Sequence, residues 1–125
     1  MGDILIIDDD LTQVDVLAHL FAKQGYRISI ANTSTDGVSI ANAQHPDLIL
    51  LDIRLPDGNG LEICSRFCDS QDTAGIPVII VSGVDNPDVV RRARAAGCHY
   101  YVRKPYDPNA LLVLSVNAIN ESRDW

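Results

Sequence analysis

The feature that most constrains this chain is the segment 47–52, in which four consecutive residues, 48–51, are all aliphatic. Successive side chains of a strand point to opposite faces, so an unbroken apolar run implies that both faces are covered. This pattern is typical of a central strand in a parallel sheet with helices on both sides. The run ends at Asp52 and meets a loop, 53–60, that contains proline and glycine. Open α/β sheets bind ligands at this end of their strands, which makes Asp52 a candidate site residue.

The rest of the chain predicts five strands that alternate with five helices, without a linker or a repeat. The strands are expected at 4–7, 27–31, 47–52, 76–82 and 98–103, and the helices at 11–24, 34–43, 60–70, 87–96 and 108–122. Gly25 and Gly97 stand where glycine commonly ends a helix. The alternation predicts an α/β fold, a doubly wound parallel sheet with helices on both faces and right-handed crossovers.

Two helices have predicted inward faces. In the first helix, the expected core residues are Leu17, Leu20 and Phe21. In the last helix they are Leu111, Leu112, Val116 and Ile119, whereas Val113 and Leu114 fall outside this face. Apolar residues left exposed there would suit a protein partner.

Composition excludes several classes of function. The 125 residues are the length of one ordinary domain, and we expect a single domain over 1–125. A net charge of −7 provides no basic surface for nucleic acid or an anionic membrane. No apolar run approaches the ~20 residues of a membrane span, and the first residues lack the features of a signal peptide. We therefore expect a cytoplasmic protein that contacts neither nucleic acid nor membrane directly, and whose three cysteines are reduced.

Polar side chains follow the predicted strands at the end where each strand leads into the next helix. In a parallel sheet these ends share one edge, so we expect the side chains to converge; they are Asp8, Asp9, Asp52, Ser82 and Lys104. Clustered carboxylates repel unless a cation neutralises them, and an all-oxygen ligand set suits Mg²⁺. Ser82 can donate to an oxyanion, and Lys104 supplies a positive charge for one. The sequence therefore predicts a site that holds a phosphoryl group beside a hard cation.

Taken together, these residues resemble the receiver domain of response regulators in two-component signalling. The resemblance covers the whole chain and rests on Asp8-Asp9, Asp52, Ser82 and Lys104-Pro105. Three further features support it, namely Leu55-Pro56-x-x-x-Gly60 after the central acid, Gly83 after Ser82, and Tyr101 three residues before Lys104.

The resemblance implies a flavodoxin-like sheet in the order 2-1-3-4-5, with Asp52 as the phosphoryl acceptor. It also implies Mg²⁺ (or Mn²⁺) bound by Asp9, Asp52 and the backbone carbonyl of Arg54. Asp8 would hold a metal-bound water. A domain of this kind accepts phosphate on its own aspartate and hydrolyses it slowly, so we do not expect an enzyme with a separate substrate.

The same resemblance assigns Ser82 and Lys104 to the phosphoryl oxygens and makes the peptide bond before Pro105 cis. The phosphate donor would be a histidine kinase or a histidine phosphotransfer protein. By analogy, the donor would dock beside the first helix, where Leu11, Val14 and Ala18 flank the inward face near the acids.

We further hypothesise a switch. Ser82 would move to bond the phosphoryl group, and Tyr101 would rotate inward into the vacated space. The face made by the fourth helix, the fifth strand and the last helix would change and join an effector domain or a second receiver. Arg54 and Val84, two residues after Asp52 and Ser82, would flank the path of the attacking water. Neither orients a water with a carboxylate or amide, so fast self-dephosphorylation is not expected.

Two alternatives remain open at this point. Asp8-Asp9-Asp10-Leu11-Thr12 reads as Asp-x-Asp-x-Thr, the start of a haloacid-dehalogenase-like phosphatase in which Asp8 is the nucleophile and Asp10 the acid/base. Against it, no acidic pair follows Lys104, there is little room for a substrate cap, and Asp52 has no role. The other alternative is a receiver-like interaction module that is never phosphorylated.

Overall fold

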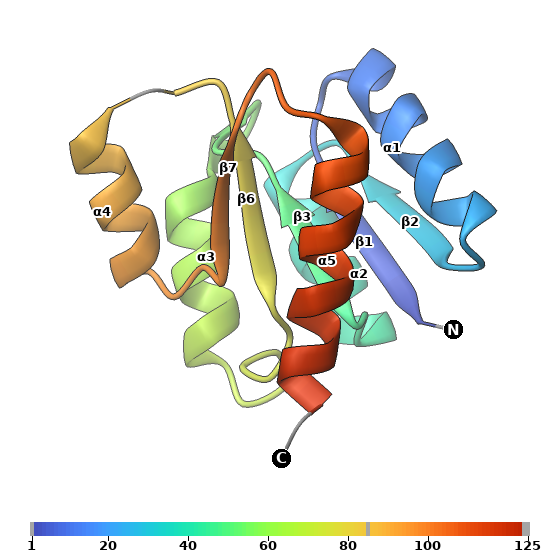
Figure 1. The fold of residues 1–125 in the computed structure, drawn as a ribbon. Helices are drawn as coiled ribbons and strands as arrows, with labels where there is room; N and C mark the ends of the chain where they lie inside the picture. Colours follow the sequence, from blue (N-terminus) through green and yellow to red (C-terminus); the bar gives the residue numbers. More distant parts are fainter. Residues whose placement is uncertain (1, 85, 124–125) are drawn as a thin grey trace.

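The computed structural model describes residues 2–84 and 86–123 (Figure 1). The main sheet contains β1 (Asp3–Ile7), β2 (Arg27–Ala31), β3 (Leu48–Leu51), β6 (Val78–Ser82) and β7 (Tyr100–Arg103). The helices are α1 (Leu11–Lys23), α2 (Ser34–Gln44), α3 (Gly60–Asp69), α4 (Pro87–Ala95) and α5 (Pro108–Arg123). None of these described helices is long and apolar enough to cross a membrane.

The five strands are parallel, and their spatial order β2-β1-β3-β6-β7 is the expected 2-1-3-4-5. The register pairs Ile7 with Leu51, so β1 and β3 end level with each other. The Asp52 N–H donates to the Ile7 carbonyl at 3.0 Å, and the Lys104 N–H donates to the Ser82 carbonyl at 2.8 Å. The ladder therefore continues into the first residue beyond β3 and β7, and it sets the polar strand ends side by side.

Each face of the sheet has its own hydrophobic layer. Helices α2, α3 and α4 cover one face, and α1 and α5 cover the other (Figure 1). Alternate residues of β3 serve the two layers, with Ile49 and Leu51 on the first side and Leu48 and Leu50 on the second. All four side chains are at most 2% exposed. The prediction of a central strand buried on both faces is confirmed.

The predicted inward face of the first helix was partly wrong. Helix α1 buries Leu17 and Phe21 as predicted, whereas Leu20 is only partly buried. Val14, which we expected to flank this face on the docking side, is buried in the core instead. Positions 14, 17 and 21 recur at the three- and four-residue spacing of one helix face, and residue 20 lies at the margin of that face.

The inward face of the last helix, α5, also differs in part from the prediction. Ser115 and Ala118 are fully buried, while Val116, predicted inward, is half-buried. The Ser115 hydroxyl donates to the Leu111 carbonyl at 2.7 Å, so its polar atom is satisfied within the helix and can face the core. Val113 is 59% exposed, as its place outside the predicted face requires.

A short hairpin lies in the loop that follows β3, and it was not predicted. Strands β4 (Arg54–Leu55) and β5 (Gly58–Asn59) pair antiparallel across Pro56-Asp57. Proline at the second and glycine at the fourth position of this turn are favourable for type I geometry. The sequence had indicated only a loop here, and the pairing orders that loop beside the site.

All three cysteines are free and pack against the layer covered by α2, α3 and α4. Cys64 is fully buried, and Cys68 and Cys98 are partly buried. Burial is the main cause that raises the pKa of each thiol. The thiols are therefore protonated, and they pack as small apolar side chains of this layer.

Candidate functional site

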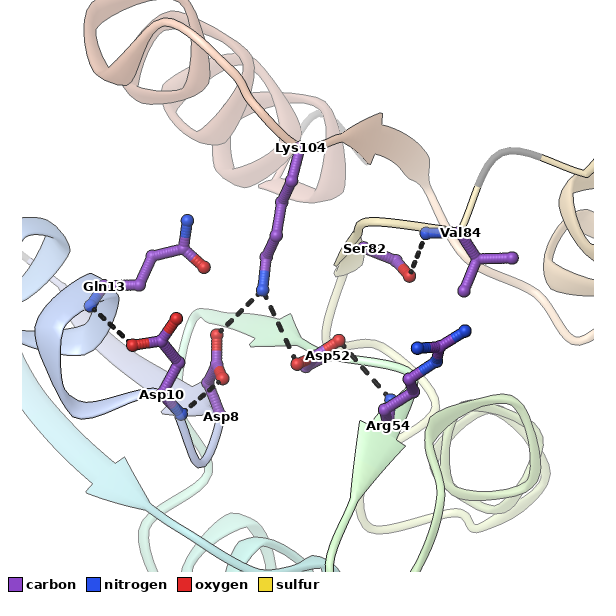
Figure 2. Close-up of polar contacts among 8 residues, drawn as sticks. All are labelled: Asp8, Asp10, Gln13, Asp52, Arg54, Ser82, Val84 and Lys104. Atoms are coloured by element: carbon purple, nitrogen blue, oxygen red, sulfur yellow. Dashed lines mark hydrogen bonds and ion pairs between the residues drawn. The ribbon is translucent and has the colours of Figure 1, made fainter.

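The polar residues predicted to converge do so at the carboxyl edge of the sheet (Figure 2). Asp8 follows β1, Asp52 follows β3, Ser82 ends β6 and Lys104 follows β7. Asp8, Asp52 and Ser82 are buried, with exposed fractions of 5%, 9% and 1%. Asp9 is exposed at the same edge, beside Asp8.

Lys104 lies between the two buried acids. Its Nζ is 3.5 Å from Oδ2 of Asp8 and 3.5 Å from Oδ2 of Asp52. The lysine side chain is only 20% exposed, so water screens these contacts less than it screens a surface pair. One ammonium group offsets part of the charge of two carboxylates, and the site retains an excess of negative charge.

Three carboxylates are close enough to share a cation. Asp8, Asp9 and Asp52 each offer one oxygen, and these oxygens all lie within 4.8 Å of one another. Carboxylate oxygens at this spacing are hard ligands that suit Mg²⁺ or Mn²⁺. The residues present therefore fit the metal that the sequence predicts.

The environment of Asp52 favours its neutral form. Burial raises its pKa most, Lys104 lowers it, and the Asp8 carboxylate raises it again. The Arg54 N–H, which donates to Asp52 Oδ1 at 3.4 Å, also lowers it, and the net direction is upward. A divalent cation near both acids would favour the charged carboxylate, the form able to act as a nucleophile.

A hollow of about 220 Å³ opens beside Asp52. Its lining residues are Asp52, Arg54, Ser82, Gly83, Val84 and Lys104. The carboxylate of Asp52, the hydroxyl of Ser82 and the ammonium of Lys104 thus border the same hollow. An oxyanion placed there would meet a hydrogen-bond donor and a positive charge.

Val84 connects two residues of the predicted switch through its backbone. Its N–H donates to Ser82 Oγ at 3.1 Å, and its carbonyl accepts from the Tyr101 hydroxyl at 2.8 Å. Tyr101 is partly buried and already packs against the core. The sequence indicated Val84 only as a residue flanking the water path, because backbone partners leave no trace in residue type.

Two other predicted features have clear positions. The Lys104–Pro105 peptide bond is cis. Asp10 is exposed, and its Oδ1 accepts the Gln13 N–H at 3.3 Å, which makes Asp10 the N-cap of α1 (Figure 2). The carboxylate that the phosphatase alternative needs as its acid/base is therefore engaged in capping a helix.

Comparison with known proteins identifies the family. A family model described as the response regulator receiver domain matches residues 4–115. Protein PilH of Pseudomonas aeruginosa is 34% identical over 119 residues, which cover 95% of this chain and 98% of PilH. The chain belongs to the response regulator receiver family.

Further relatives of this receiver agree in sequence and in fold. The polar-differentiation response regulator DivK of Brucella ovis is 31% identical over 102 residues, which cover 82% of this chain and 83% of DivK. A CheY-like response regulator receiver domain protein from Methanospirillum hungatei superposes with a TM-score of 0.93 at 28% identity, covering 98% of this chain and 97% of that one.

Family membership establishes the general function. Receiver domains are signalling domains of two-component systems that work by phosphorylation and interact with histidine kinases or phosphotransfer proteins. They generally bind Mg²⁺ at an acidic pocket, and this receiver has an aspartate cluster of that kind. The phosphatase alternative is set aside.

Sequence reasoning also missed a role for Asp57. Its carboxylate accepts hydrogen bonds from the backbone of Ser34 and Thr35, at the start of α2. The residues Pro56-Asp57-Gly58 after the central acid are typical of a turn, so the turn itself could have been predicted. No residue pattern indicates that this turn contacts a helix more than twenty residues away in the chain.

Proposed function

We propose that Asp52 is the phosphoryl acceptor of this receiver and that residues 1–125 act as one receiver domain. The observation that carries the proposal is the position of Asp52, buried beside Lys104 and Asp8 and bordering the 220 Å³ hollow. An Asp52 oxygen attacks phosphorus, the bond between phosphorus and the donor nitrogen breaks, and its electron pair leaves with the imidazole. The domain then hydrolyses its own acyl phosphate slowly.

The acidic cluster is assigned to a divalent cation. Asp9, Asp52 and the backbone carbonyl of Arg54 would bind Mg²⁺ (or Mn²⁺), and Asp8 would hold a metal-bound water. When bound, the cation offsets the charge of the carboxylates and of the transferring oxygens. The 4.8 Å spacing of the three carboxylates supports this assignment.

Ser82 and Lys104 are assigned to the phosphoryl oxygens. Both line the hollow next to Asp52, and both carry donors suited to an oxyanion. Lys104 would exchange part of its contact with the two acids for contact with the new phosphoryl group. Its positive charge stabilises the oxygens as they take up charge during transfer.

The donor would dock on α1 and the loop after β7. A groove of about 280 Å³ runs between them and includes Val16, Tyr106 and Pro108. Leu11, at the start of α1, is 64% exposed, and Val16 is 50% exposed. Burial and the nearby Asp8 carboxylate raise the pKa of Tyr106 to about 12, which supports a position next to the acids.

The switch would run through Val84. When Ser82 turns its hydroxyl toward the phosphoryl group, the Val84 N–H loses its acceptor. Val84 can then move, and with it the Val84 carbonyl that accepts from Tyr101. This modifies our sequence-based hypothesis, because the Tyr101 ring already packs inward. The output surface remains α4, β7 and α5, where an effector domain or a second receiver would bind.

The decisive experiment is labelling with acetyl phosphate followed by mapping of the modified aspartate. We expect Mg²⁺-dependent label on Asp52, lost in Asp52→Asn and retained in Asp10→Asn. Label on Asp8 would instead support the phosphatase chemistry. If the folded protein takes up no label, the proposal is refuted, and the alternative of an interaction module that is never phosphorylated is supported.

A further inference from the structure

The tip of the β4–β5 hairpin is tied to the start of a distant helix. Asp57 accepts three hydrogen bonds there, from the Ser34 N–H at 2.7 Å, the Thr35 N–H at 3.1 Å and the Thr35 hydroxyl at 2.8 Å. Thr33 is the local N-cap of α2 and accepts from the Asp36 N–H at 3.1 Å. Asp57 thus serves two helix N–H groups that the local cap does not reach.

Helix α2, which donates these hydrogen bonds, is itself packed tightly against the sheet. Ala41 is fully buried, and a Cβ placed on Gly37 would come within 2.6 Å of Ile7 in β1. The helix therefore packs closely against the central part of the sheet. Hydrogen bonds from the backbone and side chains at the start of α2 hold the pKa of Asp57 well below its usual range, so the carboxylate is charged at neutral pH.

The other side of the same hairpin contacts the phosphoacceptor. The Arg54 N–H donates to Asp52 Oδ1 at 3.4 Å, and Arg54 pairs with Asn59 across the hairpin. Gly60 closes the segment, because its N–H donates to the Ile53 carbonyl at 2.7 Å. The hairpin is short and paired, so displacement of its tip is transmitted to the Arg54 peptide.

We infer that Asp57 is a positioning residue, which pins the hairpin to α2 and thereby holds the Arg54 peptide in place beside Asp52. This inference rests on the proposed function only where Arg54 is assigned to the cation. Outer-shell partners that orient metal ligands typically contribute 10–100-fold to metal affinity. Because Asp57 acts through a hairpin and not through direct contact, we expect an effect of about tenfold, at the low end of that range.

The first test measures amide hydrogen exchange in metal-free protein for Asp57→Ala and Asp57→Asn. Exchange should speed up at Ser34 and Thr35, which lose their acceptor, and also at Arg54. Asp57→Asn keeps one acceptor oxygen and should show a smaller change. Asp36→Ala is the matched control, since it removes an acid from the same first turn of α2, whereas the bonds to Asp57 come from Ser34 and Thr35. It should leave exchange at Arg54 unchanged.

The second test is a Mg²⁺ titration followed by amide chemical shifts, with urea unfolding to confirm that each variant is folded. Asp57→Ala should raise the Mg²⁺ Kd about tenfold, and Asp36→Ala should leave it within about twofold. Faster exchange at Ser34 and Thr35 with an unchanged Arg54 amide or an unchanged Mg²⁺ Kd would overturn the inference. Wild-type protein that binds no Mg²⁺ would count against the proposed function, while the exchange at Arg54 would still decide the role of Asp57.

Discussion

The loops that follow β3 and β6 border the same hollow, but they are held in different ways. In the first, a Cβ on Gly60 would lie 2.2 Å from the Asp52 carbonyl, and Asp57 ties the hairpin tip to α2. In the second, a Cβ on Gly83 would meet no described heavy atom within 4 Å, and Val84 is held by two hydrogen bonds. The first loop is held at its base and at its tip, and the second has open space beside Gly83.

The largest expected effect comes from filling the two glycine positions. Gly60→Ala forces backbone apart next to the phosphoacceptor and should destabilise the fold by about 3 kcal/mol, the upper end for overpacking. Gly83→Ala should change the free energy of unfolding by no more than about 0.5 kcal/mol. Urea denaturation of both variants measures the difference. Equal costs would contradict the contrast between the loops.

A smaller cost is expected from the bonds to Val84. Ser82→Ala leaves the partly buried Val84 N–H without its acceptor and should cost about 1–3 kcal/mol. Tyr101→Phe removes a bond at a half-buried position and should cost about 1 kcal/mol. Both variants, and Tyr101→Ala, should lose the beryllofluoride-induced amide shifts on α4, β7 and α5. Shifts that persist unchanged would refute the coupling.

The two acids of the first loop should respond to pH in opposite directions. The folded-state pKa of Asp52 is raised above 3.8, so its charged form costs stability at neutral pH. Asp52→Asn should therefore raise the urea midpoint at pH 7, and this gain should shrink as the pH falls toward 3.8.

Asp57, whose pKa is lowered, stabilises the fold above pH 3.8. Asp57→Asn should lower the midpoint at pH 7 and lose this effect in acid. Midpoints measured from pH 7 to 3 without metal would show both trends, and matching signs would contradict the assignment.

The smallest expected effect concerns the lifetime of the phosphoryl group. Arg54 and Val84 line the hollow from the two loops, and neither carries a carboxylate or amide that would orient the attacking water. Arg54→Asn and Val84→Glu should each speed phosphate release several-fold, because they supply an amide or a carboxylate near the attacking water. Release from labelled protein, followed over time, measures the rates. If both variants release phosphate at the wild-type rate, Arg54 and Val84 do not flank the path of the attacking water.

The sequence was sufficient for those parts of the site that depend on strand ends. Asp8, Asp52 and Lys104 follow apolar strands, and the hydrogen-bond ladder of a parallel sheet determines where the strand ends lie. The inward face of α5 could not be predicted in full, because Ser115 is buried through a bond to its own helix. The bonds of Asp57 and Val84 depend on loop conformation and on backbone partners, which residue type does not encode.

The most direct test of the contrast is an amide chemical-shift map of the wild-type protein with Mg²⁺, before and after beryllofluoride. We predict large shifts at Val84, Tyr101 and along α4, β7 and α5, with only small shifts at Ser34 and Thr35, where Asp57 anchors the first loop. Large shifts at Ser34 and Thr35, with unchanged shifts at Val84, would contradict the division between a loop held by Asp57 and a loop that rearranges at Val84.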